Sequence, residues 1–325
     1  MSSTSDVPTG GNRAIVAALL ANVGIAIVKF IAFLLSGSSS MLAESVHSLA
    51  DTGNQALLLV GGRKSRKQAD DAHPFGYGRE RFVFAFVVSI ILFSVGGVFS
   101  IWEGIQKLTT PHPLENPWVP IIVLVVSIVL EAFSFRTAIR ESRHTRGTDS
   151  IPAFIRHAKA PELPIVMLED FAALIGLTLA FLGVGLTIIT GNGAFDGIST
   201  LCIGVLLVLV AIVLGVETKS LLVGEGASPG DLDAIRDAIN QHSDVEALIH
   251  IRTLYLGPDE LLVGAKIAFA RTKKLVDVAN AIDAVEASIR EAVPIARVIY
   301  LEPDVYRPRG NVDAATESII IKAAD

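Results

Sequence analysis

The hydrophobic residues of this chain gather in six long runs, each separated from the next by a short polar stretch. Each run is long enough to cross a lipid bilayer as an α-helix, which takes about 20 residues. The runs cover residues 14–35, 41–61, 82–107, 118–140, 163–190 and 196–222. The pattern predicts an α-helical membrane protein whose six transmembrane helices form a domain of residues 14–227. Residues 1–13 are polar, lack a signal-peptide pattern and are predicted to be a disordered N-terminal tail.

After the last run the pattern changes to that of a small α+β domain, residues 228–305. Ser228 and Pro229 are typical of a helix start, and Gly257–Pro258 between two strand-like runs signals a hairpin. An amphipathic helix and a further strand follow, so the order is α-β-β-α-β with the helices on one face of the sheet. Since a domain of about 80 residues is small enough to need a partner, we expect a homodimer. The polar residues 306–325 are predicted to form a flexible tail.

Composition supports the membrane prediction. The chain is 51% hydrophobic and only 18% charged, with a mean hydropathy of +0.55, a balance typical of multi-span membrane proteins. Its net charge of -6 indicates no nucleic-acid partner. The single cysteine, Cys202, excludes an intrachain disulfide.

Lysine and arginine occur in only two of the five loops between the runs. The loops after the second and fourth runs are rich in both, and the other three contain neither. Positive residues favour the cytoplasmic side of a membrane, and an even number of spans returns the chain to the side on which it began. We therefore predict that both termini and the small domain are cytoplasmic. If the source is a prokaryote, the membrane is the inner or plasma membrane.

The second run carries polar side chains where a membrane helix is normally apolar: Glu44, His47, Asp51 and Asn54. On an α-helix this spacing places them on one face, with His47 and Asp51 one turn apart. A lone polar residue such as Asn54 commonly joins one helix to another by a hydrogen bond. A stripe with two carboxylates and an imidazole indicates an ion pathway instead, because ionisable groups are costly at this depth.

The fifth run supplies two more carboxylates, Glu169 and Asp170. Counted from the cytoplasmic ends at 1.5 Å per residue, Asp51 lies about 15 Å deep and Asp170 about 10–14 Å deep, so both reach one level. Together with His47 they form a set of one nitrogen and two oxygen ligands. Such a set suits a divalent transition metal, and zinc is the first choice.

Two other charged residues lie deep within the predicted helices. Lys29, in the first run, is expected to pair with a carboxylate. Glu131, in the fourth, is expected to face the bundle interior or a water-filled cavity.

Several motifs together resemble the cation diffusion facilitator family of metal/proton antiporters. They are SGSSSMLAESVHSLAD, HPFGYGRERF, the spacing of six between Asp170 and Gly176, and the α/β domain at the end. Residues 43–81 look most like the branch that contains zinc transporter nine of animals. The resemblance implies a homodimer with six spans and a cytosolic ferredoxin-like domain, which moves zinc or a similar ion outward in exchange for protons.

The resemblance also implies a ligand set, from which this chain departs at one position. The family pairs a His/Asp-x-x-x-Asp motif in the second span with a like motif in the fifth. His47, Asp51 and Asp170 match these motifs, whereas the remaining position is Val166, which cannot bind a metal. The fourth ligand is then Glu44, Glu169 or a water molecule.

Two further metal sites of the family are incomplete here. In the loop after the second span, Asp70 and His73 match, but Tyr77 stands where the family has another histidine. Because two ligands hold a metal poorly, we interpret this segment as an ordinary loop. In the small domain, the histidines that bind regulatory zinc in relatives fall on Ala265 and Tyr300. His242 and His250 are not expected to replace them.

We therefore expect a divalent-cation/proton antiporter, with no enzymatic activity and no cofactor. Metal binding needs a neutral His47 and ionised Asp51 and Asp170, so loading releases protons and protonation expels the ion. Two alternatives stay open: transport of manganese, iron or cobalt in place of zinc, and a non-transporting metal-binding membrane scaffold. An intramembrane metalloprotease is not expected, because the chain lacks an H-E-x-x-H helix.

Overall fold

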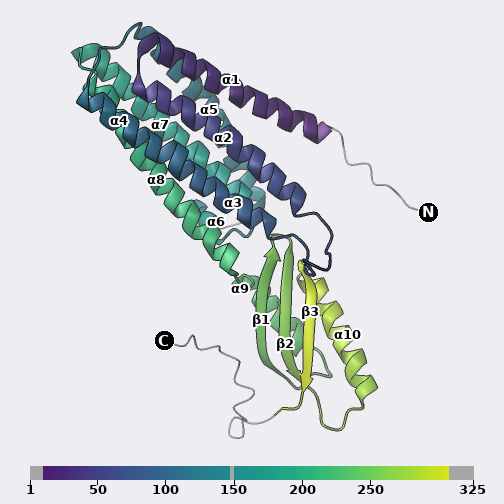
Figure 1. Ribbon diagram of the computed structural model, residues 1–325. Coiled ribbons are helices and arrows are strands. Elements are labelled where there is room, and N and C mark those ends of the chain that lie inside the picture. The colour runs from purple at the N-terminus through teal and green to yellow at the C-terminus, as the bar shows by residue number, and fades with distance from the viewer. Residues whose placement is uncertain (1–9, 147–149, 307–325) are drawn as a thin grey trace. The chain divides into compact units, whose positions relative to one another are not determined.

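The computed structural model describes residues 10–146 and 150–306 of the chain (Figure 1). It divides into two compact units, Met1–Val223 and Gly224–Asp325. Most of the two predicted tails lies outside the described residues. The first helix nevertheless begins at Gly10, ahead of the apolar run, because a helix can extend beyond the apolar residues that anchor it.

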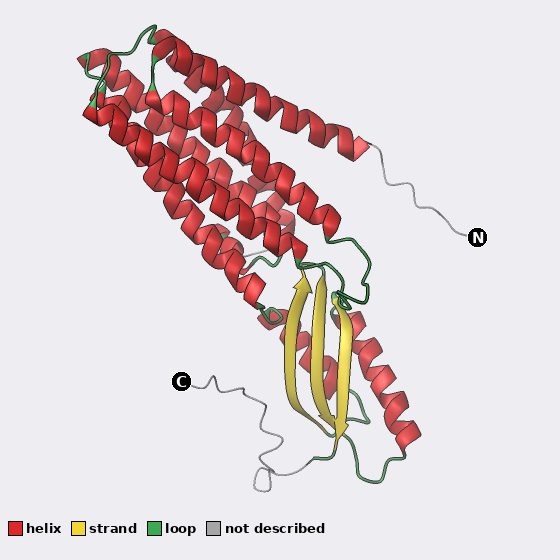
Figure 2. Ribbon diagram, in the orientation of Figure 1, coloured by secondary structure: helices red, strands yellow, loops and turns green. Residues whose placement is uncertain are grey.

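Within its described residues, the first unit consists of helices, shown in red in Figure 2. They are α1 (Gly10–Ser36), α2 (Ser39–Lys64), α3 (Glu80–Ile91), the π-helix η1 (Leu92–Val98), α4 (Phe99–Thr109), α5 (Trp118–Arg146), the short α6 (Ile151–His157), α7 (Glu162–Thr190) and α8 (Ala194–Val223). Five of the six apolar runs of the sequence each coincide with one long helix. The third run corresponds to α3, η1 and α4, which follow one another without a break.

Four helical segments are long and apolar enough to cross a membrane. They are Glu80–Thr109, Trp118–Arg143, Glu162–Thr190 and Ala194–Val223. Helix α2 is 26 residues long, but its polar side chains lower its hydropathy. The apolar segment Asn22–Ser36 of α1 is shorter than these four segments. The prediction of a helical membrane domain is thereby confirmed, whereas the count of six spans stays a prediction.

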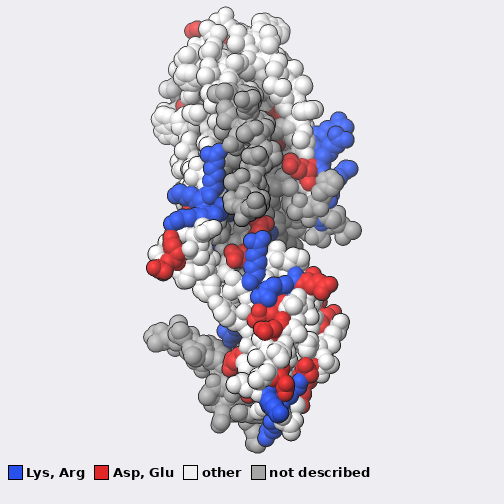
Figure 3. Space-filling view, turned by 90° about the vertical axis from the view of Figure 1, so that its right-hand side faces the viewer, with Lys and Arg blue, Asp and Glu red and all other residues white. Residues whose placement is uncertain are grey.

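Large apolar side chains cover much of the outer surface of this unit. Phe133 is 73% exposed and Ile189 is 82% exposed, and the view in Figure 3 shows a surface with few charged side chains over most of the helical unit. Exposed apolar surface on this scale is unfavourable in water and is expected where side chains contact lipid.

Helix α2 lies inside the bundle and packs against α1, α3, α7 and α8. Close packing depends in part on small residues, as is usual between membrane helices. A Cβ atom at Gly104 of α4 would lie 2.7 Å from the backbone nitrogen of Leu201 in α8, so only glycine allows these two helices to approach so closely.

The first turn of α2 is fixed to the first turn of α8 by a buried carboxylate. Asp196 accepts hydrogen bonds from the backbone N–H and the hydroxyl of Ser39, from the Ser38 hydroxyl at 2.9 Å and from the Ser40 hydroxyl. The turn before them contains Gly37, whose φ of +63° favours glycine. The contacts set the position of one end of the helix that carries the polar stripe.

The second unit is the predicted small α+β domain. It consists of α9 (Pro229–Asn240), β1 (Ala247–Gly257), β2 (Glu260–Ala268), α10 (Leu275–Ala292) and β3 (Ala296–Asp304). The sheet has the order β1-β2-β3, with β1 and β2 antiparallel and β2 and β3 parallel. As expected, α9 and α10 cover one face of the sheet, where Ile235, Val263, Val285 and Ile289 are buried (Figure 1).

Candidate metal centre

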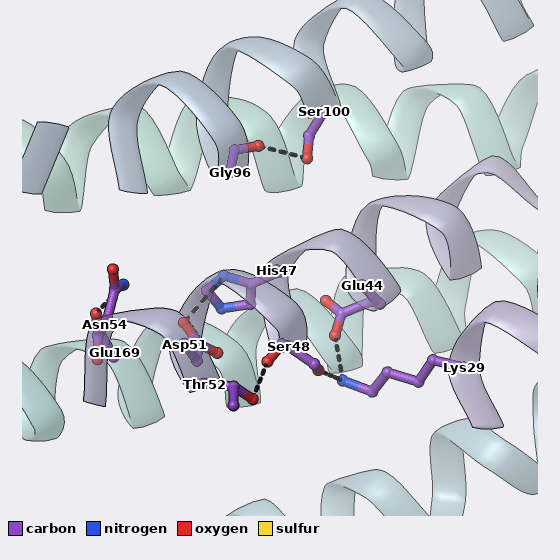
Figure 4. A network of polar contacts seen from close by, with 10 residues as sticks. All are labelled: Lys29, Glu44, His47, Ser48, Asp51, Thr52, Asn54, Gly96, Ser100 and Glu169. Carbon is purple, nitrogen blue, oxygen red and sulfur yellow. Dashed lines mark hydrogen bonds and ion pairs between the residues drawn. The ribbon is translucent and has the colours of Figure 1, made fainter. Parts of the chain in front are cut away.

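The polar stripe of α2 points into the helix bundle (Figure 4). Glu44, His47 and Asn54 are buried, and the side chain of Asp51 is 19% exposed. The predicted helical spacing is therefore confirmed, and the stripe faces protein instead of lipid.

His47 and Asp51 lie side by side but are not hydrogen-bonded. Nδ1 of His47 is 3.5 Å from Oδ1 of Asp51. Among the described residues, neither ring nitrogen of His47 nor this oxygen has a hydrogen-bond partner. A buried polar atom without a partner costs about 1–3 kcal/mol, and three such atoms here share one small region. One of the two nitrogens of this imidazole, together with the carboxylate oxygen, fits a divalent transition metal.

Glu44 is held by a lysine. Nζ of Lys29, on α1, lies 3.0 Å from Oε2 of Glu44 and donates a second hydrogen bond of 2.8 Å to the hydroxyl of Ser48. The expected pairing of Lys29 with a carboxylate is confirmed. Oε1 of Glu44 has no partner among the described residues and lies beside Gly176 of α7.

Glu169 and Asp170, adjacent on α7, face different neighbours. Glu169 accepts a hydrogen bond of 2.7 Å from the side-chain amide of Asn54, on α2. Asp170 accepts one of 2.9 Å from the hydroxyl of Ser134, on α5, and it also contacts Glu131. Glu169 thus joins α7 to α2, whereas the side chain of Asp170 is engaged by α5.

The three predicted ligands are neighbours, but they do not form one coordination sphere in this structure. Asp51 on α2 and Asp170 on α7 both lie inside the bundle, where these two helices pack against each other. In the part of the chain that the structure describes, no group of three or more His, Cys, Asp or Glu side chains is arranged to hold a metal ion. Val166, one turn before Asp170 on α7, is partly buried.

A π-helix passes beside the histidine. A Cβ atom at Gly96, within η1, would lie 4.0 Å from Nδ1 of His47. π-Helices are rare and frequently occur at functional sites. The sequence analysis missed this feature, as it missed Ser134, because neither a π-turn nor a single serine in an apolar helix has a distinctive sequence pattern.

The loop between α2 and α3 contains a compact polar cluster outside the membrane helices. Oδ2 of Asp70 accepts hydrogen bonds from Nζ of Lys67 at 2.8 Å and from the Tyr77 hydroxyl at 2.7 Å. These two bonds hold the pKa of Asp70 well below its usual range. The bond to Asp70, with a second to Tyr77, raises the pKa of Lys67 to about 12.

His73 completes this cluster through its backbone and its ring, whose Nδ1 lies 3.4 Å from Oδ1 of Asp70. Its N–H donates to Oδ1 of Asp70 at 2.9 Å, and its ring stacks on Tyr77 with 4.3 Å between the centroids. The cation beside Asp70 is therefore the Lys67 ammonium group. The interpretation of this segment as an ordinary loop stays a prediction.

The small domain has a hollow lined by residues of all three strands and by Glu286 of α10. The cavity has a volume of about 480 Å³, and its lining includes His250, Arg252, Ala265, Tyr300 and Glu302. Ala265 and Tyr300 supply no metal ligand in the positions that the resemblance implies. Lys266, on β2, pairs with Glu302 and Asp304 on β3, and these bonds raise the pKa of Lys266.

Comparison with known proteins decides the family. Residues 15–223 match the family model of the cation efflux transmembrane domain. The chain belongs to this family. The match runs from within α1 to the end of α8 and includes every residue of the candidate site. It confirms the resemblance found in the sequence.

Curated relatives agree with this assignment. The mouse (Mus musculus) proton-coupled zinc antiporter SLC30A9, mitochondrial, is 30% identical over 263 residues, which are 80% of this chain and 46% of that protein. Metal tolerance protein C4 of Arabidopsis thaliana is 32% identical over 79% of this chain and 57% of its own length. The chain thus spans about half the length of these relatives. The cation-efflux pump FieF of Cronobacter sakazakii is 29% identical over 77% of this chain and 79% of the pump.

Proposed function

We propose that this cation efflux protein exports a divalent transition-metal ion in exchange for protons, and that the ion is zinc. The observation that carries the proposal is the pair His47 and Asp51, whose buried nitrogen and oxygen atoms have no hydrogen-bond partner among the described residues. Relatives named as a proton-coupled zinc antiporter and as a cation-efflux pump support the same class of activity.

The proposed ligands are His47, Asp51 and Asp170. When the ion binds, α7 and α2 are proposed to bring Asp170 to the other two ligands, at the expense of its hydrogen bond to Ser134. The attraction between two carboxylates and a divalent cation favours this movement.

The fourth ligand is proposed to be water. Val166 has no atom that can bind a metal. Each of the two glutamates that stood as alternatives has one oxygen already engaged: Oε2 of Glu44 by Lys29, and Oε1 of Glu169 by Asn54. A site that must release its ion can keep an open position, as catalytic zinc sites do.

Proton coupling follows from the ligand chemistry. The ion binds to neutral imidazole and to ionised carboxylates, so binding releases protons and protonation weakens binding. If the helices expose the site first to one side of the membrane and then to the other, this competition drives ion export against proton entry.

The remaining features of the architecture are also part of the proposal. Helices α1 and α2 are proposed to span the membrane together with the four apolar segments, giving six spans. Because the basic loops follow the second and fourth spans, both termini lie on the cytoplasmic side. The small domain, proposed to be ferredoxin-like, joins two copies of the chain into a homodimer.

Ion flux into sealed vesicles tests the proposal. Purified protein in liposomes is expected to carry Zn²⁺ when a pH gradient is imposed. Protons are expected to move in the opposite direction, so the pH of the lumen should change in step with the zinc flux. Asp51→Asn is the matched negative control. Parallel measurements with Mn²⁺, Fe²⁺ and Co²⁺ identify the preferred ion.

The scaffold alternative predicts a different result in the same vesicles. Metal would bind to the purified protein, but no flux would follow the pH gradient. Absence of both binding and flux for all four ions would contradict the proposed function itself.

A further inference from the structure

We propose that Lys29 sets the ion selectivity of the transport site by keeping the carboxylate of Glu44 away from the ion. The inference rests on the proposed function and concerns a residue that is not a ligand. Lys29 lies on α1, and its side chain reaches α2 next to the proposed ligands (Figure 4).

The ammonium group is buried and well bonded. Lys29 is 3% exposed, and Nζ contacts Oε2 of Glu44 at 3.0 Å and the hydroxyl of Ser48 at 2.8 Å. These two residues flank His47 in sequence. The lysine therefore places a fixed positive charge within one helical turn of the site.

Stabilisation of the fold does not by itself explain why this ion pair is buried. Two charges removed from water lose hydration, and well-packed apolar residues often replace a buried ion pair without loss of stability. Ionisable groups inside a membrane helix bundle usually belong to an ion pathway. The position of this pair beside His47 favours a role in handling the ion.

Glu44 is otherwise well placed to become a ligand. It lies three residues before His47 on the same helix face, and its Oε1 atom has no partner among the described residues. Gly176 of α7 makes room for the carboxylate, since a Cβ atom at that position would lie 2.8 Å from Oε1. What holds Glu44 in place is the bond from its other oxygen to Lys29.

The chemical consequence concerns hard and soft ions. With Glu44 withheld, the proposed ligands are one nitrogen, two carboxylates and water. Release of Glu44 replaces the water with a third carboxylate, whose second oxygen can raise the coordination number above the four that zinc prefers. Octahedral sites rich in oxygen favour Mn²⁺ relative to Zn²⁺. Lys29 thereby maintains the preference for zinc.

Competition between Zn²⁺ and Mn²⁺ for the purified full-length protein tests this inference. Lys29→Met keeps the length of the side chain and removes its charge. We expect this change to lower the ratio of zinc affinity to manganese affinity by about 10-fold, the scale on which residues just outside a metal shell act. The double variant Lys29→Met/Glu44→Gln is expected to restore the ratio, because the released carboxylate is gone.

Lys107→Met is a matched control for the loss of a buried lysine. Lys107 is also buried, but it donates to the backbone carbonyl of Gly37 at 2.7 Å instead of a carboxylate. Its replacement is expected to leave the affinity ratio unchanged. An unchanged ratio in folded Lys29→Met would overturn the inference.

Glu44→Gln keeps the inference falsifiable if Lys29→Met does not fold. A large fall in zinc affinity in this variant would show that Glu44 is already a ligand, and would overturn the role of Lys29.

Asp51→Ala distinguishes a failure of the inference about Lys29 from a failure of the proposed metal site. If Asp51→Ala abolishes zinc binding while the Lys29 variants leave the ratio unchanged, only the inference about Lys29 is wrong. If Asp51→Ala leaves zinc binding intact, the proposed site itself is wrong.

Discussion

Asn54 of α2 donates a hydrogen bond of 2.7 Å to Glu169 of α7, and Glu169 directly precedes Asp170. Both side chains in this contact are buried. The bond joins the two helices that carry the proposed ligands, at the level of those ligands. It therefore limits how far Asp170 can move from His47 and Asp51.

Loss of this bond is expected to weaken the site. In Asn54→Ala the buried carboxylate of Glu169 loses its partner, so we expect zinc affinity to fall by about 10-fold. The free energy of unfolding should fall by about 1–3 kcal/mol. Calorimetric titration with zinc and thermal unfolding measure the two effects. Asn22→Ala is the matched control, because Asn22 makes a similar amide bond of 3.0 Å between α1 and α2, to Gln55.

The proposed ligands themselves are the subject of a second prediction. Asp51→Ala and Asp170→Ala are each expected to abolish zinc transport, because each removes a negatively charged ligand. Size-exclusion chromatography should still show folded protein, since neither side chain belongs to the apolar core. Normal transport by either variant would rule out the proposed ligand set.

A third prediction concerns Val166. This residue lies one turn before Asp170, so a histidine there points toward the same region. Val166→His is expected to bind zinc more tightly and to discriminate more strongly against manganese, because an imidazole replaces water as the fourth ligand. Turnover in vesicles should fall, since a tightly held ion leaves slowly. Weaker zinc binding would instead show that the shell is already closed by Glu44 or Glu169.

The loop cluster gives a prediction about pH. The bonds from Lys67 and Tyr77 lower the pKa of Asp70 below its usual value of 3.8, so this group stabilises the loop above that value and ceases to do so as the pH falls through its lowered pKa. The pKa of Lys67 is raised from 10.5 to about 12, so its contribution is complete below 10.5 and is lost as the pH rises through about 12. The cluster should therefore stay intact across the whole neutral range.

Carbon-13 NMR of labelled aspartate can follow the carboxyl group of Asp70, with Asp70→Asn to assign its signal. The signal is expected to remain that of a carboxylate as the pH is lowered to 3.8. In Lys67→Gln it should titrate closer to that usual value. An identical titration in both proteins would contradict the role of Lys67.

A fifth prediction concerns the anchor of α2. Asp196→Ala leaves the hydroxyls of Ser38, Ser39 and Ser40 without their shared acceptor inside the protein. Because breaking a buried charged network is costly, we expect a loss of about 3–5 kcal/mol in the free energy of unfolding. Thermal unfolding in detergent measures it. Asp233→Ala, at an exposed position on α9, should have little effect.

The sequence by itself determined the long helices, the elements of the small domain and the family, but not the π-helix η1 or the short helix α6. Long apolar runs can only be accommodated as membrane helices, because every backbone polar group in lipid must be bonded within its own segment. Alternation and turn residues likewise predicted the hairpin and the order of the small domain. The helical spacing placed His47 and Asp51 together, because that relationship depends only on the geometry of one helix.

The tertiary structure alone decided which partner each buried polar group has. Lys29 meets Glu44 across 15 positions, Asn54 meets Glu169 across 115, and Asp196 meets Ser38 across 158. Such contacts depend on how each helix is rotated and how closely it packs, and a hydrophobic pattern does not specify either to within a hydrogen-bond length. For the same physical reason the sequence predicted that Asp51 and Asp170 lie near one level, but it did not predict that Glu44 and Glu169 are already bonded or that Asp170 faces Ser134.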